Sequence, residues 1–272
     1  MGNWIWGGVA AAVGAYAVVL GGAFAGQRRL MYFPDSERPS PQQSGVAEMA
    51  EVSLETEDGL SLLAWHRPPT DSAHPTLVYF HGNAGNIGMR AYKIRPYLDA
   101  GFGVLLTTWR GFSRNPGKPS EAGLYQDGRA ALKFLQSAGT APERIVLYGE
   151  SLGTGVAVHL AEARAPAALV LEAPYSSITD IAQARTPFLP VRSLLLDRFE
   201  STAKIAAVAA PLLIVHGARD GTIPLRFGKK LFDAAREPKV MHICPEAGHN
   251  DLYEHGMGAL VLEFLGTALE IS

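Results

Sequence analysis

The sequence predicts an α/β protein built on a mostly parallel, eight-stranded sheet with helices on both faces. Three observations support this prediction. Six short apolar runs, typical of strands buried on both faces, alternate with helical stretches between residues 76 and 269. Two earlier strand candidates, joined by a Glu57-Asp58-Gly59 turn, predict a hairpin at the start of the sheet. The chain of 272 residues is also long enough to bury one large core.

The first element is an uncharged stretch from Trp4 to Gly26. A helix of this length, at about 1.5 Å per residue, crosses the roughly 30 Å core of a bilayer. We therefore expect an N-terminal transmembrane helix, a single-pass anchor over residues 1–29. The positive-inside rule, applied to Arg28 and Arg29, places the following domain in the cytoplasm. Two alternatives stay open: Ala23-Phe24-Ala25 resembles a signal-peptidase site, although no basic side chain precedes the apolar run, and a buried core helix would need a polar face.

Residues 30–45 follow as the expected juxtamembrane segment. Leu30 to Phe33 is still apolar and is expected to lie at the membrane interface or against the domain, whereas the Pro, Ser and Gln content of Pro34–Gly45 predicts a flexible linker. The globular domain is expected to occupy residues 46–272. Ser120 is placed to cap its second helix. The expected strands are 50–54, 60–65, 76–80, 104–108, 145–148, 168–171, 212–215 and 240–243, and the expected helices are 87–100, 121–137, 152–164, 225–235 and 252–269.

One connection is too long to be an ordinary loop. Between Tyr175 and Pro211 the chain passes through about 35 residues without a clear strand, whereas most connections have about 4–6 residues. The segment is apolar, so we expect residues 176–210 to form a small cap over the carboxyl ends of the strands. The alternative is an insertion that only packs against the sheet. The cap residues that could line a substrate groove are Phe188, Leu189, Val191 and Leu195.

The most informative motif is Gly149-Glu150-Ser151-Leu152-Gly153, which fits the nucleophile-elbow pattern G-x-S-x-G. The pattern alone is weak, but here it lies between an expected strand, 145–148, and an expected helix, 152–164. In that context a sharp turn exposes the serine hydroxyl, and glycines two residues to either side avoid a backbone collision. Ser151 is therefore the candidate nucleophile, with an ordinary turn serine as the alternative.

A serine hydroxyl is a poor nucleophile, so the elbow predicts a base and a group that orients the base. Asp220 follows the next-to-last expected strand, and His249 follows the last one. The order serine, acid, histidine fits a hydrolase of this architecture. Glu172 stays open as an alternative acid, and Asp220 could instead be an Asp-Gly turn residue. His216 is expected to bind loop backbone.

An oxyanion hole needs two backbone N–H groups. Leu152, the residue after the nucleophile, is expected to supply one of them. Asn83 is expected to supply the other, from the loop His81-Gly82-Asn83-Ala84-Gly85-Asn86 that follows strand 76–80. A phosphate cradle is the alternative for this loop, but the Lys and Ser/Thr of a P-loop are missing from it.

Composition excludes several other functions. The net charge is −2 and no basic run is present, so we expect no nucleic-acid partner. The single cysteine, Cys244, excludes an intramolecular disulfide and a cysteine-based metal site, and its apolar neighbours predict a buried thiol. We expect neither a cofactor nor a metal.

Five motifs occur in a fixed order along the chain. Together they resemble the membrane-anchored α/β-hydrolase-domain serine hydrolases related to the yeast bud-emergence protein, from about Leu30 to the last helix. The resemblance implies the α/β-hydrolase fold, with catalytic Ser151, Asp220 and His249, and with Asn83 and Leu152 at the oxyanion hole. The motifs are His81-Gly82-Asn83-Ala84-Gly85-Asn86, Trp109-Arg110-Gly111-Phe112-Ser113 with residues 117–124, Gly149–Gly153, Leu171-Glu172-Ala173-Pro174-Tyr175 and Ala247–Asp251.

One loop departs from the form associated with that group. Trp109 and Ser113-Arg114-Asn115 replace part of a Tyr-Arg-Gly-Tyr-Gly-x-Ser pattern. Any specificity that the loop carries in the group is therefore not implied for this chain.

The group is similar to acyl-protein thioesterases and lipid monoacyl esterases. We therefore expect a membrane-anchored serine hydrolase that cleaves ester or thioester bonds of apolar acyl substrates, with a membrane lipid or an acylated molecule as its partner. A serine peptidase on the same fold and a catalytically silent membrane scaffold are the alternatives. The complete set of Ser151, Asp220 and His249 argues against the scaffold, which has no need of all three.

Overall fold

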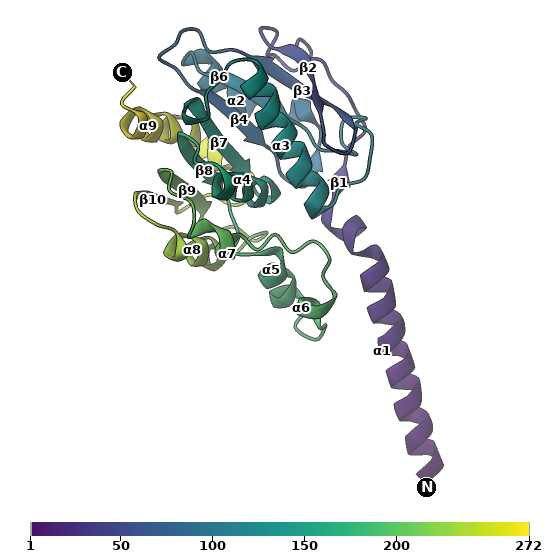
Figure 1. The fold of residues 1–272 in the computed structure, drawn as a ribbon. Helices are drawn as coiled ribbons and strands as arrows, with labels where there is room; N and C mark the ends of the chain where they lie inside the picture. The colour runs from purple at the N-terminus through teal and green to yellow at the C-terminus, as the bar shows by residue number, and fades with distance from the viewer. Residues whose placement is uncertain (1, 272) are drawn as a thin grey trace.

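The computed structural model describes residues 2–271, with side chains from residue 6 onward (Figure 1). Met1, where the expected anchor starts, and Ser272, where the expected domain ends, lie outside the described residues. The described part contains one large sheet with helices on both faces, a long N-terminal helix that projects from it, and short helices on the same side as that projection.

The large sheet has eight strands in the order β10-β9-β8-β7-β4-β6-β3-β2. β2 and β3 form the expected hairpin, β3 runs antiparallel to β6, and the other neighbours are parallel. Every residue of β4, β6, β7, β8 and β9 is buried, as their apolar runs predict. The predicted fold class is therefore confirmed. The strands are β2 (Ala50–Glu55), β3 (Ser61–Arg67), β4 (Thr76–Phe80), β6 (Gly103–Thr107), β7 (Ile145–Glu150), β8 (Ala168–Glu172), β9 (Leu212–Gly217) and β10 (Lys239–Cys244).

Helices cover both faces of the sheet and close two apolar cores (Figure 1). One layer contains α2 and α9, and the other contains α3, α4 and α8. Ser120 caps α3 by accepting a hydrogen bond from the Gly123 N–H, as predicted. The helices are α2 (Ala91–Asp99), α3 (Glu121–Ser137), α4 (Leu152–Ala163), α8 (Leu225–Ala234) and α9 (Met257–Leu269), and η2 (Pro142–Arg144) precedes β7.

Two expected helices each begin with a short 3-10 helix that is separate from the α-helix that follows. The stretch 87–100 begins as η1 (Ile87–Arg90), which the Asn86 side chain caps, before α2 begins. The stretch 252–269 begins as η3 (Leu252–His255) and is interrupted at Gly256, whose φ of 84° is left-handed. The sequence predicts single helices because apolar residues continue across both breaks.

The N-terminal helix α1 (Gly2–Met31) projects from the domain (Figure 1). From Trp6 to Met31 it is long and apolar enough to cross a membrane. Trp6 and Val18 are 73% and 75% exposed. Such exposure is incompatible with a helix in the core of a soluble domain, so that alternative is excluded.

Residues 34–45 do not form the flexible linker that their composition predicts. Phe33–Pro34 forms β1, which pairs in parallel with β5 (Ala84–Gly85) in a second, two-stranded sheet. The Asp35 carbonyl accepts a hydrogen bond from the Ser113 N–H at 2.9 Å. From composition alone, the backbone groups of this segment are expected to bind water. In the structure they instead form hydrogen bonds with loops of the domain, and these bonds hold the end of α1 against the domain.

The insertion at residues 176–210 contains three short helices. α7 (Ser201–Ile205) packs against α4 and α8 and so belongs to a helical layer of the sheet. α5 (Ile178–Arg185) and α6 (Val191–Leu194) extend away from the sheet on the side from which α1 projects (Figure 1). Residues 176–200, which contain α5 and α6, are called the cap below.

A buried charge cluster lies beneath the end of β7. The Lys93 ammonium of α2 is 2.6 Å from Glu172 of β8 and 3.2 Å from Glu150 of β7. Arg90 contacts Glu150 at 3.0 Å, and Tyr148 donates to Glu172 at 2.7 Å. Burial alone would lower the pKa of Lys93, but the two carboxylates outweigh it and raise that pKa above its usual range. The charged form of Lys93 and the charged forms of Glu150 and Glu172 therefore stabilise each other.

The substitution Lys93→Met tests this mutual stabilisation. It leaves two buried carboxylates without their shared cation, and such a loss costs about 3–5 kcal/mol of unfolding free energy. Arg95→Met is the matched control, because Arg95 lies on the same helix but pairs with Glu48 at the surface, where a salt bridge contributes about 0–1 kcal/mol. Urea unfolding in detergent measures both variants, and equal losses would contradict the expected difference.

Candidate active site

Ser151 stands between β7 and α4 with φ 50° and ψ −114°, a backbone conformation that residues with a side chain rarely adopt. The flanking glycines make this turn feasible. A Cβ at Gly149 would lie 2.6 Å from Thr154 Cα, and a Cβ at Gly153 would lie 2.0 Å from the Phe80 carbonyl oxygen. The strand, sharp turn and helix of a nucleophile elbow are therefore all present.

His249 lies between Ser151 and Asp220. Its Nε2 is 3.0 Å from Ser151 Oγ, and its Nδ1 is 2.7 Å from Asp220 Oδ2. Because an ionised carboxylate only accepts hydrogen bonds, Nδ1 carries a hydrogen, and in the neutral ring Nε2 is then free to accept from the serine hydroxyl. The structure thus brings the three candidate triad residues together in one hydrogen-bond chain.

The Asp220 carboxylate is also held by the backbone of its own turn. Its Oδ1 accepts hydrogen bonds from the N–H groups of Thr222 and Ile223, both at 2.7 Å. Burial would raise the pKa of Asp220, but the hydrogen bond and charge of His249, with the backbone donors, lower that pKa below its usual value. The carboxylate is therefore ionised and oriented toward the imidazole.

The rival candidates make other contacts. Glu172, the alternative acid, is bonded to Lys93 and to Tyr148. His216 donates to the Ile223 carbonyl at 2.8 Å, in agreement with its expected role on loop backbone. His216 is fully buried and stabilises the turn that presents Asp220.

The peptide between Gly82 and Asn83 is fixed near the nucleophile. His81 Nδ1 donates to the Gly82 carbonyl at 2.7 Å, and a Cβ at Gly82 would lie 3.5 Å from Ser151 Cβ. The carbonyl and the N–H of a trans peptide point in opposite directions, so the His81 bond also fixes the direction of the Asn83 N–H. The Leu152 N–H starts α4, where helical N–H groups have no intrahelical partner.

His81 is held in one tautomer. Its Nε2 accepts from the Thr108 hydroxyl at 3.2 Å, while Nδ1 donates. Burial, with the nearby charge of Arg90, lowers the pKa of His81 to about 3, so the ring is neutral. Trp109 donates to the His81 carbonyl at 3.1 Å. Trp109, one of the departures from the resembled pattern, therefore supports this loop and is fully buried.

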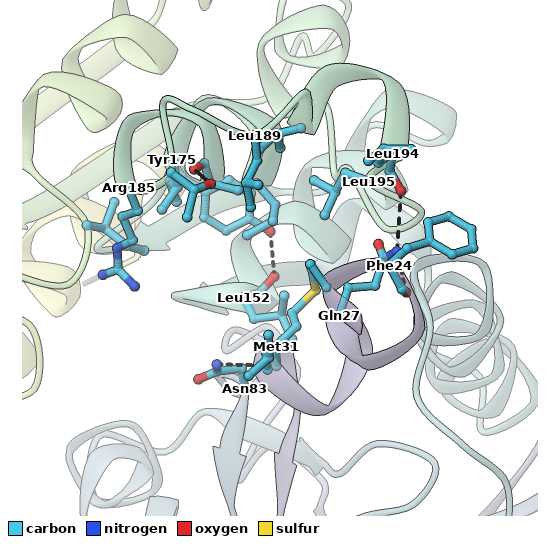
Figure 2. A pocket seen from close by; sticks show the side chains of 18 of the residues that line it. Phe24, Gln27, Met31, Asn83, Leu152, Tyr175, Arg185, Leu189, Leu194 and Leu195 are labelled. Atoms are coloured by element: carbon cyan, nitrogen blue, oxygen red, sulfur yellow. Dashed lines mark hydrogen bonds between the residues drawn. The ribbon is translucent and has the colours of Figure 1, made fainter. Parts of the chain in front are cut away.

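The same loop is bonded to the end of α1. The Asn83 side chain donates to the Met31 carbonyl at 2.7 Å (Figure 2). The Asn83 carbonyl accepts from the Phe33 N–H at 2.8 Å. Asn83 thus connects the candidate oxyanion hole to the N-terminal helix.

An apolar cavity of about 330 Å³ opens at Ser151 between α1 and the cap (Figure 2). Its volume lies within the range of roughly 300–1,000 Å³ that is usual for small-molecule sites. Ser151, Leu152 and Asn83 line its inner end. A candidate nucleophile and both candidate oxyanion donors therefore face one apolar space.

Cap residues line this cavity only in part as the sequence predicts. Leu189, Val191 and Leu195 line it, together with Ile178 and Ile181 of α5, which the sequence analysis did not single out. The proposed role of Phe188 in a substrate groove does not hold. Its side chain lies in the turn between α5 and α6 and is 66% exposed, outside the cavity.

Sequence reasoning also missed the wall that α1 contributes. The wall residues are Leu20, Ala23, Phe24, Gln27, Leu30 and Met31. The spacing of three and four residues is a sequence signal for one helical face. The polar Gln27 at the end of an apolar stretch is a second signal, because polar groups in such helices usually face protein.

The arrangement is suited to acyl transfer through a serine nucleophile. It offers a hydroxyl beside an imidazole, a carboxylate that orients the imidazole, and two backbone N–H groups for a developing oxyanion. In the described part of the chain, no group of three or more His, Cys, Asp or Glu side chains is arranged to hold a metal ion. Cys244 is buried in β10, as expected.

Known proteins are similar to this chain over most of its length. A family model described as alpha/beta hydrolase fold matches residues 75–203. An uncharacterised protein of Mycobacterium tuberculosis is 43% identical over 83% of this chain and 81% of that protein. Protein bem46 of Schizosaccharomyces pombe is 32% identical over 86% of this chain and 83% of its own, which confirms the resemblance to the yeast group. The lysophosphatidylserine lipase ABHD12 of Danio rerio is 30% identical over 79% of this chain and 65% of its own.

Solved structures agree on the fold. An esterase of Pyrococcus furiosus has a TM-score of 0.70 with this chain at 17% identity, over 88% of this chain and 99% of that one. At this identity the likeness concerns the arrangement of the sheet and helices alone.

The substitution Gly153→Ala tests the close approach of α4 to β4. The new Cβ would lie 2.0 Å from the Phe80 carbonyl oxygen, so we expect a loss of at least about 2 kcal/mol in unfolding free energy, the scale of an overpacked core. Gly266→Ala in α9 is the control. Its Cβ would lie 3.5 Å from the Ile271 carbonyl, and helix propensity predicts a gain of up to about 1 kcal/mol. Chemical denaturation compares the two, and an unchanged stability of Gly153→Ala would refute the packing argument.

Proposed function

The chain belongs to the α/β-hydrolase family, and on that premise we propose that it is a membrane-anchored serine hydrolase for ester or thioester bonds of apolar acyl substrates. One observation carries the proposal: the hydrogen-bond chain from Asp220 through His249 to Ser151 ends at an apolar cavity. The esterases and lipases among the similar proteins support the reaction class.

In the proposed mechanism, His249 Nε2 takes the proton of Ser151 as Oγ attacks the acyl carbonyl carbon. Asp220 stabilises the imidazolium, and the N–H groups of Asn83 and Leu152 stabilise the oxyanion. The intermediate collapses as His249 gives the proton to the leaving alcohol or thiol. A water molecule, deprotonated by His249, then attacks the acyl-enzyme and releases the acid, and His249 returns a proton to Ser151.

The cavity supports an apolar acyl group. Its walls carry Leu20 and Phe24 of α1 and Leu189, Val191 and Leu195 of the cap. Burial of a methylene group contributes about 0.8 kcal/mol, so such walls favour longer chains. Esters and thioesters share a tetrahedral oxyanion, so the same two donors serve both. The name of the zebrafish relative, a lysophosphatidylserine lipase, supports a lipid ester.

Membrane anchoring by α1 is part of the proposal. The helix is long and apolar enough to span a bilayer, and Arg28 and Arg29 follow directly after its uncharged part. The positive-inside rule then places the catalytic domain on the cytoplasmic side. The opposed proposal is a signal sequence cleaved after Ala25, which would remove three of the residues that line the cavity, Leu20, Ala23 and Phe24.

The substitution Ser151→Ala tests the nucleophile. We expect kcat for p-nitrophenyl butyrate to fall by about 10⁶-fold, the scale of triad serines, with unchanged thermal unfolding. Labelling by an alkyl fluorophosphonate should disappear in the same variant. Near-normal hydrolysis by folded Ser151→Ala protein would exclude Ser151 as the nucleophile, whereas an absence of hydrolysis and labelling in the native chain would favour a scaffold.

The cap residues offer a test of the acyl preference. In the native chain, kcat/KM should rise from the acetate to the octanoate of a p-nitrophenyl series. Leu195→Gln places a polar group in the cavity wall and should flatten this rise, by about tenfold at the octanoate. Phe188→Gln is the matched control, because Phe188 lies outside the cavity, and it should keep the native profile. A native preference for acetate would count against the proposed substrate class.

Intact-mass analysis tests the anchor. Protein extracted from membranes should begin at Met1 or Gly2, because an uncleaved anchor keeps its N-terminus. A mature protein that begins near Gly26 would establish the cleaved signal instead and would move the domain to the other side of the membrane.

A further inference from the structure

The N-terminal helix and the cap are joined along one side of α1. The Tyr16 hydroxyl donates to the Phe188 carbonyl at 2.8 Å. Further along, the Gln27 amide accepts from the Leu196 N–H at 2.7 Å and donates to the Leu194 carbonyl at 3.3 Å. From Tyr16 to Gln27 an α-helix rises about 16 Å. The cap therefore follows α1 over a substantial part of its length.

A buried carboxylate stabilises the contact between α1 and the cap at the end of α1 nearest the domain. Asp197 of the cap is 4% exposed at its side chain and pairs with Arg28 of α1 at 2.8 Å. The same carboxylate accepts from the Tyr32 hydroxyl and from the Glu121 N–H at the start of α3, both at 3.1 Å. Removing its partners would leave a buried charge, which is costly. The contact of α1 with the cap is therefore specific.

One face of α1 lies toward the cavity and the other faces are exposed. The half-buried cavity residues of this face are Leu20, Ala23, Gln27 and Met31. Val18, on the opposite face, is 75% exposed. Figure 2 shows Phe24, Gln27 and Met31 across the cavity from Leu189, Leu194 and Leu195. The helix therefore contributes a wall to the cavity along its inner face only.

Exposed apolar groups lie outside the cavity, on the cap segments that are bonded to α1. Phe188 and Leu196, whose backbones bond to α1, are 66% and 50% exposed. Exposed apolar side chains grouped next to a helix that can span a bilayer are suited to contact with lipid chains. The contact between α1 and the cap thus has Ser151 in the cavity that it encloses and lipid-compatible groups on its exposed side.

We propose that α1 is a wall of the substrate site, and that the acyl chain of a bilayer lipid lies between α1 and the cap with its ester carbonyl at Ser151. This inference rests on the proposed function and adds a role for the anchor helix. Because the wall is continuous with the membrane span, an acyl chain reaches Ser151 sideways from the bilayer without passing through water. The acyl chain then stays in apolar surroundings throughout, so the unfavourable transfer of the chain from the bilayer into water is avoided.

The substitution Ala23→Trp, in full-length protein, tests this arrangement by filling the cavity from the α1 side. Ala25→Trp is the matched control, because Ala25 is exposed, lies on the same turn and does not line the cavity. We expect Ala23→Trp to lower kcat/KM for p-nitrophenyl dodecanoate in phosphatidylcholine vesicles by about tenfold or more. Activity on p-nitrophenyl acetate, whose acyl group ends near Ser151, should fall much less than activity on the dodecanoate, so that the ratio of the two kcat/KM values changes by about tenfold. Ala25→Trp should leave both substrates unaffected.

A photocrosslinking probe gives an independent measurement on the native chain. A long-chain fluorophosphonate with a diazirine at its chain end forms an oxygen–phosphorus bond with Ser151 as fluoride leaves and His249 takes the serine proton. On irradiation, the chain end should crosslink to the peptide that contains Leu20 to Met31. Crosslinks confined to the central sheet or to α8 would overturn the proposal.

These experiments distinguish a failure of the proposed function from a failure of the proposed role of α1. If the fluorophosphonate fails to label Ser151 and Ser151→Ala still hydrolyses esters, the proposed function itself is wrong. If labelling succeeds but Ala23→Trp and Ala25→Trp behave alike on the dodecanoate, the proposed function stands and the role of α1 is refuted. An equal fall on acetate and dodecanoate in Ala23→Trp alone would also refute it, because a blocked chain site spares the short ester.

Discussion

The left-handed backbone of Ser151 is the constraint on which the rest of the site depends. A side-chain-bearing residue in a sparsely populated conformation costs about 1–3 kcal/mol and persists only where its surroundings determine it fully. Here Gly153 allows α4 to approach the Phe80 carbonyl, and the Ser151 N–H donates to the Glu172 carbonyl at 2.9 Å. The packing of the sheet and α4 therefore presents the hydroxyl at the point that His249 can reach.

The buried charges beneath the elbow follow from the same geometry. Glu150 and Glu172 are direct neighbours on β7 and β8, so their carboxylates would repel each other in an apolar environment. Burial would raise the pKa of Glu150, but Lys93 and Arg90 outweigh it and lower that pKa. The cations stabilise the two carboxylates and bind them in ion pairs. Asp220, on a separate turn, is then the carboxylate that orients His249.

The sequence predicts those features that depend on residues close together in the chain. The strand runs, the G-x-S-x-G context and the positions of Asp220 and His249 after successive strands suffice for the fold and for the triad candidates. They do not determine which side of a short turn faces a cavity: Leu189 lines it and Phe188, its neighbour, is exposed. Contacts such as that between Gln27 and Leu194 join residues far apart in the chain, and no local pattern specifies them. The expectation of a flexible linker within residues 30–45 is wrong for the same reason, because the backbone groups of this segment form hydrogen bonds with loops that are distant in the chain.

Two sets of hydrogen bonds hold the backbone that carries the candidate oxyanion donor, one from within the domain and one from the end of α1. His81 holds the Gly82 carbonyl from within the domain: its lowered pKa keeps the ring neutral, and its bonds to the Gly82 carbonyl and the Thr108 hydroxyl place the hydrogen on Nδ1. The Met31 carbonyl and the Phe33 N–H hold Asn83 from the end of α1. A displacement of α1 would release the second set of hydrogen bonds and leave the first. The direction of the Asn83 N–H, the candidate oxyanion donor, therefore depends partly on where the N-terminal helix ends, so this helix is structurally part of the candidate site.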